Sequence, residues 1–166
     1  KGVTGEEHII AGRKLKEAGI ELSEYIMPGL GGKAMSRQHA ENTARVLNAI
    51  NPDFIRSRPF SPLPGTPMLD DYMNNRLEIL SPYERLEEIK ILITGLNVES
   101  RVCFDHFRNP AYYNAAGQII HLFKQDYDGY KFPEGKETVL ALIEKGLNIS
   151  EAQFLQTKDF IHLCII

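Results

Sequence analysis

The chain has 166 residues, of which 43% are hydrophobic and 25% charged, and its formal net charge is −3. This balance is typical of a globular protein, and a slightly acidic chain has no electrostatic footprint for nucleic acid. The sequence contains no run of about 18 apolar residues, so we expect no membrane span. The two cysteines, Cys103 and Cys164, lie far apart, which favours a reducing compartment and predicts a cytoplasmic protein.

The chain begins with a predicted helix and strand. Residues 4–7 form a capping box before a helix that carries Ala11, Leu15 and Ala18 at helical spacing and stops at residue 19. Residues 20–27 are largely apolar, as expected of a buried parallel strand, and Tyr25 is predicted to lie in the core. Residues 29–32 form a glycine-rich turn.

A second helix and strand follow that turn. Ser36 is the expected cap of a helix that ends at Asn51 and Pro52, and residues 53–58 form the next predicted strand. Strands that alternate with helices over short connections predict a parallel sheet with right-handed crossovers. The helix has one apolar face, made by Ala40, Thr43, Ala44, Leu47 and Ile50.

Three more elements are predicted before residue 109. Residues 69–76 form a short helix, and residues 81–84 are a capping box with proline at the first helical position. Residues 100–104 form the third strand. The helix between them has an apolar stripe at Leu86, Ile89, Ile93 and Leu96.

Residues 110–166 differ in character and are interpreted as a mostly helical extension. The pattern predicts helix at residues 119–123, 137–145 and 150–166, and a polar linker at residues 126–135. Residues 110–117 have no clear preference.

The segment at residues 56–68, which leaves the second strand, is rich in proline. Because proline lacks an amide proton and has a fixed φ, this segment should be stiff and extended. Its carbonyl groups and Gly65 could approach a flat ligand closely. A rigid loop at the carboxyl end of a strand is where α/β proteins bind ligands. The prolines are Pro59, Pro62, Pro64 and Pro67.

This segment resembles the sixth-strand exit of radical S-adenosylmethionine (SAM) enzymes, where a Pro-x-Pro-Gly-Thr-Pro run is common. Residues 24–32 resemble the fifth-strand motif of that superfamily, and the match covers about the first 100 residues. The resemblance implies an α/β fold in which residues 1–109 form the C-terminal half of a TIM-like (β/α) barrel, followed by a small helical tail. It also implies a parent enzyme that cleaves SAM at a [4Fe–4S] cluster to a 5′-deoxyadenosyl radical acting on an unknown substrate.

The chain departs from that family in its cysteines. Radical SAM enzymes hold the cluster on a Cys-x3-Cys-x2-Cys loop, and Cys103 and Cys164 cannot replace it. We therefore expect no metal site in this chain, and we interpret the chain as the C-terminal part of a larger enzyme, inactive alone. A complete barrel needs about 250 residues. The missing N-terminal half is the expected partner, and an exposed sheet edge predicts self-association or cover by residues from 150 onward.

The glycine-rich turn and the proline-rich segment supply the candidate cofactor residues. Any tight βα turn favours glycine, but the resemblance favours proximity to SAM, and Gly29→Val is then expected to block SAM binding more than it unfolds the protein. The spacing is not that of a dinucleotide fingerprint. By resemblance, the residues expected to face SAM are Ser23, Met27, Gly29, Gly31, Arg58 and Pro59.

Other polar residues near the strand ends are candidates for chemistry. Arg56 and Arg58 project to one face and need anionic partners or solvent, either a substrate group or a neighbouring carboxylate. Asp105 and His106 are weak catalytic candidates, because adjacent residues on a strand point in opposite directions and cannot form a simple dyad. The role of Asn109 beside them is open. The other histidines, His8, His39, His121 and His162, lack the spacing of metal ligands.

Two alternative functions remain open at this stage. The chain could be a non-catalytic α/β ligand-binding or interaction domain that shares the turn motifs. It could also be an ordinary TIM-barrel lyase or isomerase that uses Asp105 or His106. In each case we expect a small-molecule ligand, and neither nucleic acid nor a membrane.

Overall fold

The computed structural model describes residues 2–163, with side chains to residue 160. Four strands form one sheet in the order β1-β2-β3-β6, in which β1, β2 and β3 are parallel and β6 is antiparallel to β3. The parallel strands are β1 (Ser23–Ile26), β2 (Phe54–Ser57) and β3 (Arg101–Cys103), and the last strand is β6 (Tyr130–Lys131). Strands β4 (Ala111–Tyr113) and β5 (Ile119–His121) form a separate antiparallel pair.

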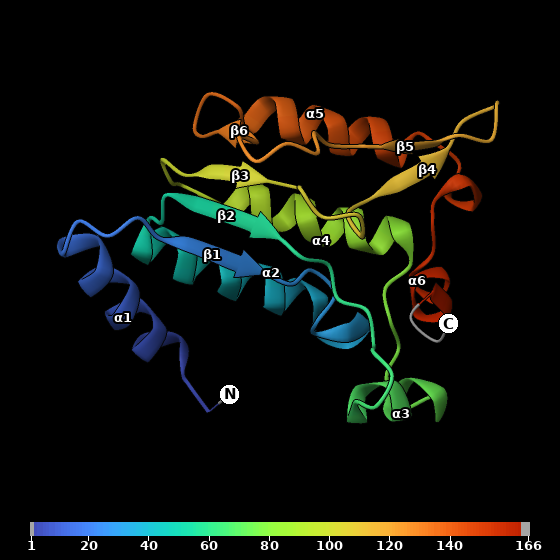
Figure 1. The fold of residues 1–166 in the computed structure, drawn as a ribbon, viewed down its shortest axis with the longest axis horizontal. Helices are drawn as coiled ribbons and strands as arrows, with labels where there is room; N and C mark the ends of the chain where they lie inside the picture. Colours follow the sequence, from blue (N-terminus) through green and yellow to red (C-terminus); the bar gives the residue numbers. More distant parts are fainter. Residues whose placement is uncertain (1, 164–166) are drawn as a thin grey trace.

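Helices α2, α4 and α5 pack on one face of the four-stranded sheet (Figure 1). Figure 1 shows α2 and α4 behind the sheet, with α1 beside β1 and α5 at the β6 edge. Among residues 2–163, no helix covers the front face of the sheet in this view. The helices are α1 (Gly5–Glu17), α2 (Gly32–Ile50), α3 (Pro67–Met73), α4 (Pro82–Gly95), α5 (Lys136–Leu147) and α6 (Thr157–Leu163), with a 3-10 turn, η1, at Glu151–Gln153.

Two of the predicted helix starts are confirmed. The Thr4 hydroxyl accepts a hydrogen bond from the Glu7 amide at 3.2 Å, and the Glu7 carboxylate accepts one from the Thr4 amide at 2.8 Å. A second capping box joins Ser81 and Glu84 at the start of α4. The start of α2 differs from the prediction, because the helix begins at Gly32 and Ser36 lies inside it.

The hydrophobic core lies between the sheet and helices α2, α4 and α5. The predicted face of α2 is buried except for the half-buried Thr43, and the predicted stripe of α4 is buried throughout. These helices cover Ile55 of β2 and Val102 of β3, both of which have no exposed surface. Helix α1 differs from the prediction: it buries Ile9 and Gly12, whereas Leu15 is 38% exposed.

The first strand is shorter and less buried than the sequence indicates. β1 is an edge strand, and of its four residues only Ile26 is buried. The prediction that Tyr25 lies in the core is wrong, because its side chain is 65% exposed. Tyr25 is paired in register with Arg56, on the sheet face opposite Ile26 and Ile55.

The extension contributes more strand than predicted. The helix predicted at residues 119–123 is wrong: Asn114 and Gly117 form a turn that folds β5 back on β4. Part of the predicted linker is β6, which pairs with β3. The domain boundary after residue 109 stays a prediction, although both segments contribute to one buried cluster.

The final segment packs on the β4 side of the molecule rather than on the exposed edge of β1. Phe154 forms an isolated bridge with Tyr112 of β4, and the Thr157 hydroxyl contacts Arg85 of α4. The expectation that an exposed edge of the sheet self-associates or is covered by this tail stays a prediction. Residues 164–166, including Cys164, lie outside the described residues, as does the His162 side chain. None of the described helices is both long and apolar enough to cross a membrane.

Candidate functional site

A cavity of about 230 Å³ opens where β1 and β2 end. Three of the residues expected to face SAM, Met27, Arg58 and Pro59, line this cavity together with His106. The proline-rich segment supplies most of the remaining wall, which is largely apolar. These residues are Phe60, Ser61, Pro62, Leu63, Thr66 and Met68.

The segments that follow β1 and β2 stay paired beyond the ends of the two strands. The Arg58 amide donates to the Ile26 carbonyl at 2.8 Å, and the Phe60 amide donates to the Pro28 carbonyl at 2.8 Å. The proline-rich segment then turns into α3, which is capped by the Thr66 hydroxyl. The cavity is thus a product of parallel strand pairing followed by a segment that cannot continue the sheet.

Arg56 and Arg58 lie on the same face of the sheet and share one carboxylate. The Arg58 guanidinium binds both oxygens of Asp105, at 3.1 and 2.9 Å, and Arg56 Nη1 lies 3.4 Å from Asp105 Oδ2. The hydrogen bonds that Arg58 donates to Asp105 raise the pKa of Arg58. Burial alone would raise the pKa of Asp105, but the hydrogen bonds from Arg58 hold it below its usual value. Asp105 is therefore ionised at neutral pH and poorly suited to carry a proton.

Aromatic rings hold both guanidinium groups in place. The Arg56 guanidinium carbon lies 4.9 Å from the centre of the Phe54 ring and 5.3 Å from that of Tyr127. The Arg58 guanidinium lies 5.0 Å from the Tyr25 ring centre. Such cation–π contacts restrict the side chains and lower the cost of ordering them when a ligand binds.

His106 faces the cavity, whereas Asp105 faces the arginines. The Arg108 amide donates to His106 Nδ1 at 3.3 Å. Burial and the nearby charges of Arg58 and Arg108 lower the pKa of His106, so its ring is neutral near pH 7. Asn109 is buried, and its amide donates to the carbonyls of Ser57 and His106 at 3.2 and 3.0 Å. These bonds give Asn109 a structural part in holding the loop after β3.

The glycine-rich turn lies beside the cavity but is not part of its lining. Gly29 has a φ of 90°, and its amide donates to the two oxygens of Glu88 at 3.0 and 3.2 Å. A Cβ on Gly29 would lie 3.7 Å from both Arg85 and Phe60, so it would point toward protein. Gly31 caps α2, and neither glycine lines the cavity. Ser23 starts β1 and also lies outside the cavity lining.

Two charged residues of α4 that the sequence analysis did not single out hold the turn and the proline-rich segment. Glu88 is 2% exposed and accepts hydrogen bonds from Ser36 at 3.0 Å and His39 at 2.7 Å, in addition to Gly29. Arg85 donates to the Phe60 carbonyl at 3.3 Å and to Thr157 at 2.6 Å. Burial lowers the pKa of Arg85 to about 10.

The sequence does carry a signal for these residues. Arg85 lies four positions before Ile89, and Glu88 lies four positions before Leu92. Both charged residues therefore sit on the apolar stripe of the helix, where side chains four apart share one face. A charge on such a stripe predicts a buried, hydrogen-bonded partner.

The described residues do not fit an iron–sulfur cluster. No group of three histidine, cysteine or acidic side chains within residues 2–163 is placed to hold a metal ion. Cys103 is buried, its thiol donates to the Tyr127 carbonyl at 3.3 Å, and burial raises its pKa. A protonated, buried thiol is a poor metal ligand.

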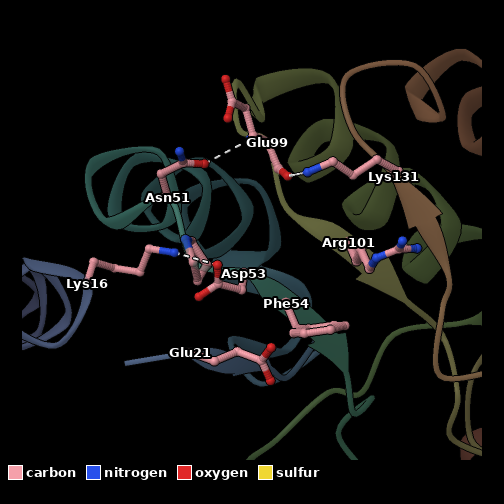
Figure 2. Close-up of a pocket in the computed structure, with 9 residues that line it drawn as sticks. Lys16, Glu21, Asn51, Asp53, Phe54, Glu99, Arg101 and Lys131 are labelled. Carbon is pink, nitrogen blue, oxygen red and sulfur yellow. Dashed lines mark hydrogen bonds and ion pairs between the residues drawn. The ribbon is translucent and has the colours of Figure 1, made fainter. Parts of the chain in front are cut away.

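A second cavity, of about 300 Å³, lies at the other end of the sheet, where the strands begin. Figure 2 shows Lys16 bonded to Asp53, and Asn51 and Lys131 bonded to the backbone of Glu99. The lining carries three basic and three acidic side chains: Lys16, Arg101, Lys131, Glu21, Asp53 and Glu99.

Comparison with known proteins gives one informative similarity. The fold is similar to that of archaeal Methanocaldococcus infernus Elp3, in a structure lacking N-terminal residues 1–46. The TM-score is 0.52 at 21% sequence identity, and the match covers 88% of this chain and 32% of that chain. No family model and no curated protein matches the sequence. The chain thus spans about a third of the Elp3 chain, and the similarity is one of fold.

Proposed function

We propose that this chain forms the C-terminal wall of a SAM-binding site in a radical SAM enzyme. The observation that carries the proposal is the cavity at the carboxyl ends of β1 and β2, lined by Met27, Arg58 and Pro59. These residues come from the two motifs that resemble the superfamily, and they meet at the edge where α/β folds bind ligands. The similarity to the Elp3 fold supports the same assignment.

The cavity suits part of SAM rather than the whole molecule. Its volume of about 230 Å³ is below the roughly 300 Å³ at which pockets for drug-sized ligands begin. Met27, Phe60 and Leu63 offer apolar contacts to a flat base, and backbone carbonyls of the proline-rich segment can accept its amino protons. The rest of the cofactor would be held by residues outside this chain.

The cluster would also be held by residues outside this segment. A [4Fe–4S] cluster and SAM together would supply radical chemistry to the intact enzyme. The residues described in this chain bind and orient, and they exclude water from one side of the site. We assign them no electron or hydrogen transfer.

The lyase or isomerase alternative receives less support from the site. It requires Asp105 or His106 to move a proton, but Asp105 is held as an anion by two arginines. His106 has no carboxylate bonded to its Nδ1, which accepts from a backbone amide instead. A general base is normally oriented by such a partner.

The test is SAM binding by the intact natural protein, with its cluster reconstituted without oxygen. Met27→Ala removes an apolar wall and should weaken SAM binding about tenfold, since burying a methionine side chain is worth about 1.5–3 kcal/mol. Met73→Ala is the matched control, because Met73 lies on α3 outside the cavity and is 68% exposed. Unchanged SAM affinity in Met27→Ala, or no SAM binding by the wild-type protein, would count against the proposal.

A further inference from the structure

The helix-free face of the sheet carries an arginine on its second strand. Arg56 lies on β2, paired in register with Tyr25 of β1 on one side and Cys103 of β3 on the other. Ile55 and Ser57 point to the helices and have no exposed surface, so Arg56 projects from the opposite face. Figure 1 shows that no described helix lies over that face.

Two arginines of this face contact a single carboxylate. Arg56 and Arg58 are both cations, and the carboxylate within reach of them is Asp105, which is 2% exposed. Arg58 occupies both carboxylate oxygens through hydrogen bonds, whereas Arg56 has an ion-pair contact at 3.4 Å. The three side chains together leave one positive charge.

The excess charge lies on Arg56. Its side chain is 14% exposed, and its Nη1 is buried without a hydrogen bond to any described residue. Nη1 is closed to solvent and faces Asp105 at 3.4 Å, so a ligand would bind through the remaining, exposed part of the guanidinium. Phe54 and Tyr127 contact the guanidinium from 4.9 and 5.3 Å and fix its orientation before any ligand binds.

We propose that Arg56 binds an anionic group, a carboxylate or a phosphate, on the substrate of this enzyme. A planar guanidinium matches both anions through paired hydrogen bonds, and it remains charged in a partly buried site. The rings of Tyr25 and Tyr127, which are 65% and 74% exposed, offer apolar surface beside it. The substrate class is therefore an apolar or aromatic molecule with one acidic group. This assignment rests on the proposed function, because it names the substrate of the same enzyme. Arg56 lies outside the lining of the cavity and is linked to it through Asp105 and Arg58.

The test uses calorimetric titration of the intact natural protein with three probes of similar size. Benzoate and phenyl phosphate carry the two candidate anions, and benzyl alcohol is the neutral control. We expect at least one anion to bind about tenfold or more tightly than benzyl alcohol, and Arg56→Gln to remove that preference. Arg101→Gln is the matched control, since Arg101 lies on the same face but contacts Asp128.

Preference for benzoate identifies a carboxylate substrate, and preference for phenyl phosphate identifies a phosphate substrate. Equal binding of all three probes, or an anion preference that survives Arg56→Gln, overturns the proposal. If Arg56→Gln does not fold, Arg56→Lys is the alternative variant. Lysine cannot form the paired hydrogen bonds, so this variant should bind the anionic probe more weakly, and an unchanged affinity for the probe overturns the assignment.

SAM titration of the same variants separates this inference from the proposed function. If the protein binds SAM but not the anionic probes, the anion site at Arg56 is contradicted and the proposed function is not. If it binds an anionic probe through Arg56 but not SAM, the proposed function is contradicted and the anion site is not.

Discussion

The two ends of the parallel sheet use charge in different ways. At the end where the strands begin, basic and acidic side chains are equal in number around the cavity, and they join neighbouring loops at the surface. At the end where the strands finish, the charged groups are buried: Glu88 and Asp105 are each 2% exposed. Glu88 binds Gly29, Ser36 and His39, and Asp105 binds Arg58 and contacts Arg56.

This difference indicates which end is built for stability and which for a ligand. Exposed ion pairs contribute little individually, so the first end can be altered at small cost. The buried carboxylates fix the glycine turn and the two arginines in one arrangement around an apolar cavity. A site that must hold a ligand needs such fixed groups, and they are costly to disturb.

The largest effect is expected from Glu88→Ala. This change removes the acceptor for Gly29, Ser36 and His39, and it leaves a buried amide without a partner. Breaking a buried, hydrogen-bonded charge costs about 3–5 kcal/mol. Denaturant titration of the intact natural protein measures the loss. Glu87→Ala, one residue away on the exposed face of α4, should change stability by less than about 0.5 kcal/mol. Equal effects of the two changes would contradict the comparison.

Asp105→Asn should lower the free energy of unfolding somewhat less, by about 2–3 kcal/mol at pH 7, because Arg56 and Arg58 retain partial access to water. The pKa of Asp105 is lowered in the folded protein. Its contribution is therefore present above the unfolded value near 3.9 and is lost as pH falls through the folded value. Denaturant midpoints at pH 7 and pH 3 should differ more in the wild type than in Asp105→Asn. An equal difference in both proteins would show that this carboxylate is not coupled to folding.

The sequence predicts the elements whose signals are local. The capping boxes at Thr4 and Ser81 and the apolar stripes of α2 and α4 need only helical spacing, and the structure has them. The sequence does not reveal that Tyr25 is exposed, because an apolar run does not show whether a strand is central or at an edge. The sequence predicts a helix instead of β5 at residues 119–123, because a run of five residues fits a helix or a strand equally well.

The candidate site was predictable only in part. Met27, Arg58 and Pro59 follow strands that are parallel neighbours, so their meeting at one edge follows from topology. The hydrogen bond from Gly29 to Glu88 spans 59 residues, and no local pattern encodes it. Alternation placed Arg56 and Arg58 on one face, but their shared partner, Asp105, depends on the neighbour relation of β2 and β3.

Gly29→Val tests whether the glycine-rich turn at the carboxyl end of the sheet serves stability or contacts SAM. Gly29 has a φ of 90°, which a β-branched residue adopts only with strain, and the new side chain would point toward Arg85 and Phe60. We expect a stability loss of about 1–2 kcal/mol, and a fall in SAM affinity no larger than the unfolding explains. Denaturant midpoint and SAM affinity are measured on the same variant. Lost SAM affinity with an unchanged midpoint would instead support direct contact between this turn and the cofactor.

The smallest effect is expected at the opposite end, from Lys16→Gln. Lys16 and Asp53 are 31% and 36% exposed, so their ion pair should contribute less than about 1 kcal/mol and should weaken in high salt. The hydrogen bond from Lys16 lowers the pKa of Asp53, so any contribution is present above about pH 4 and lost as pH falls through the folded value. Lys14→Gln on the exposed side of α1 is the control. Denaturant midpoints at low and high salt compare the two variants. A loss in Lys16→Gln as large as that in Glu88→Ala would mean that the two ends of the sheet are not built differently.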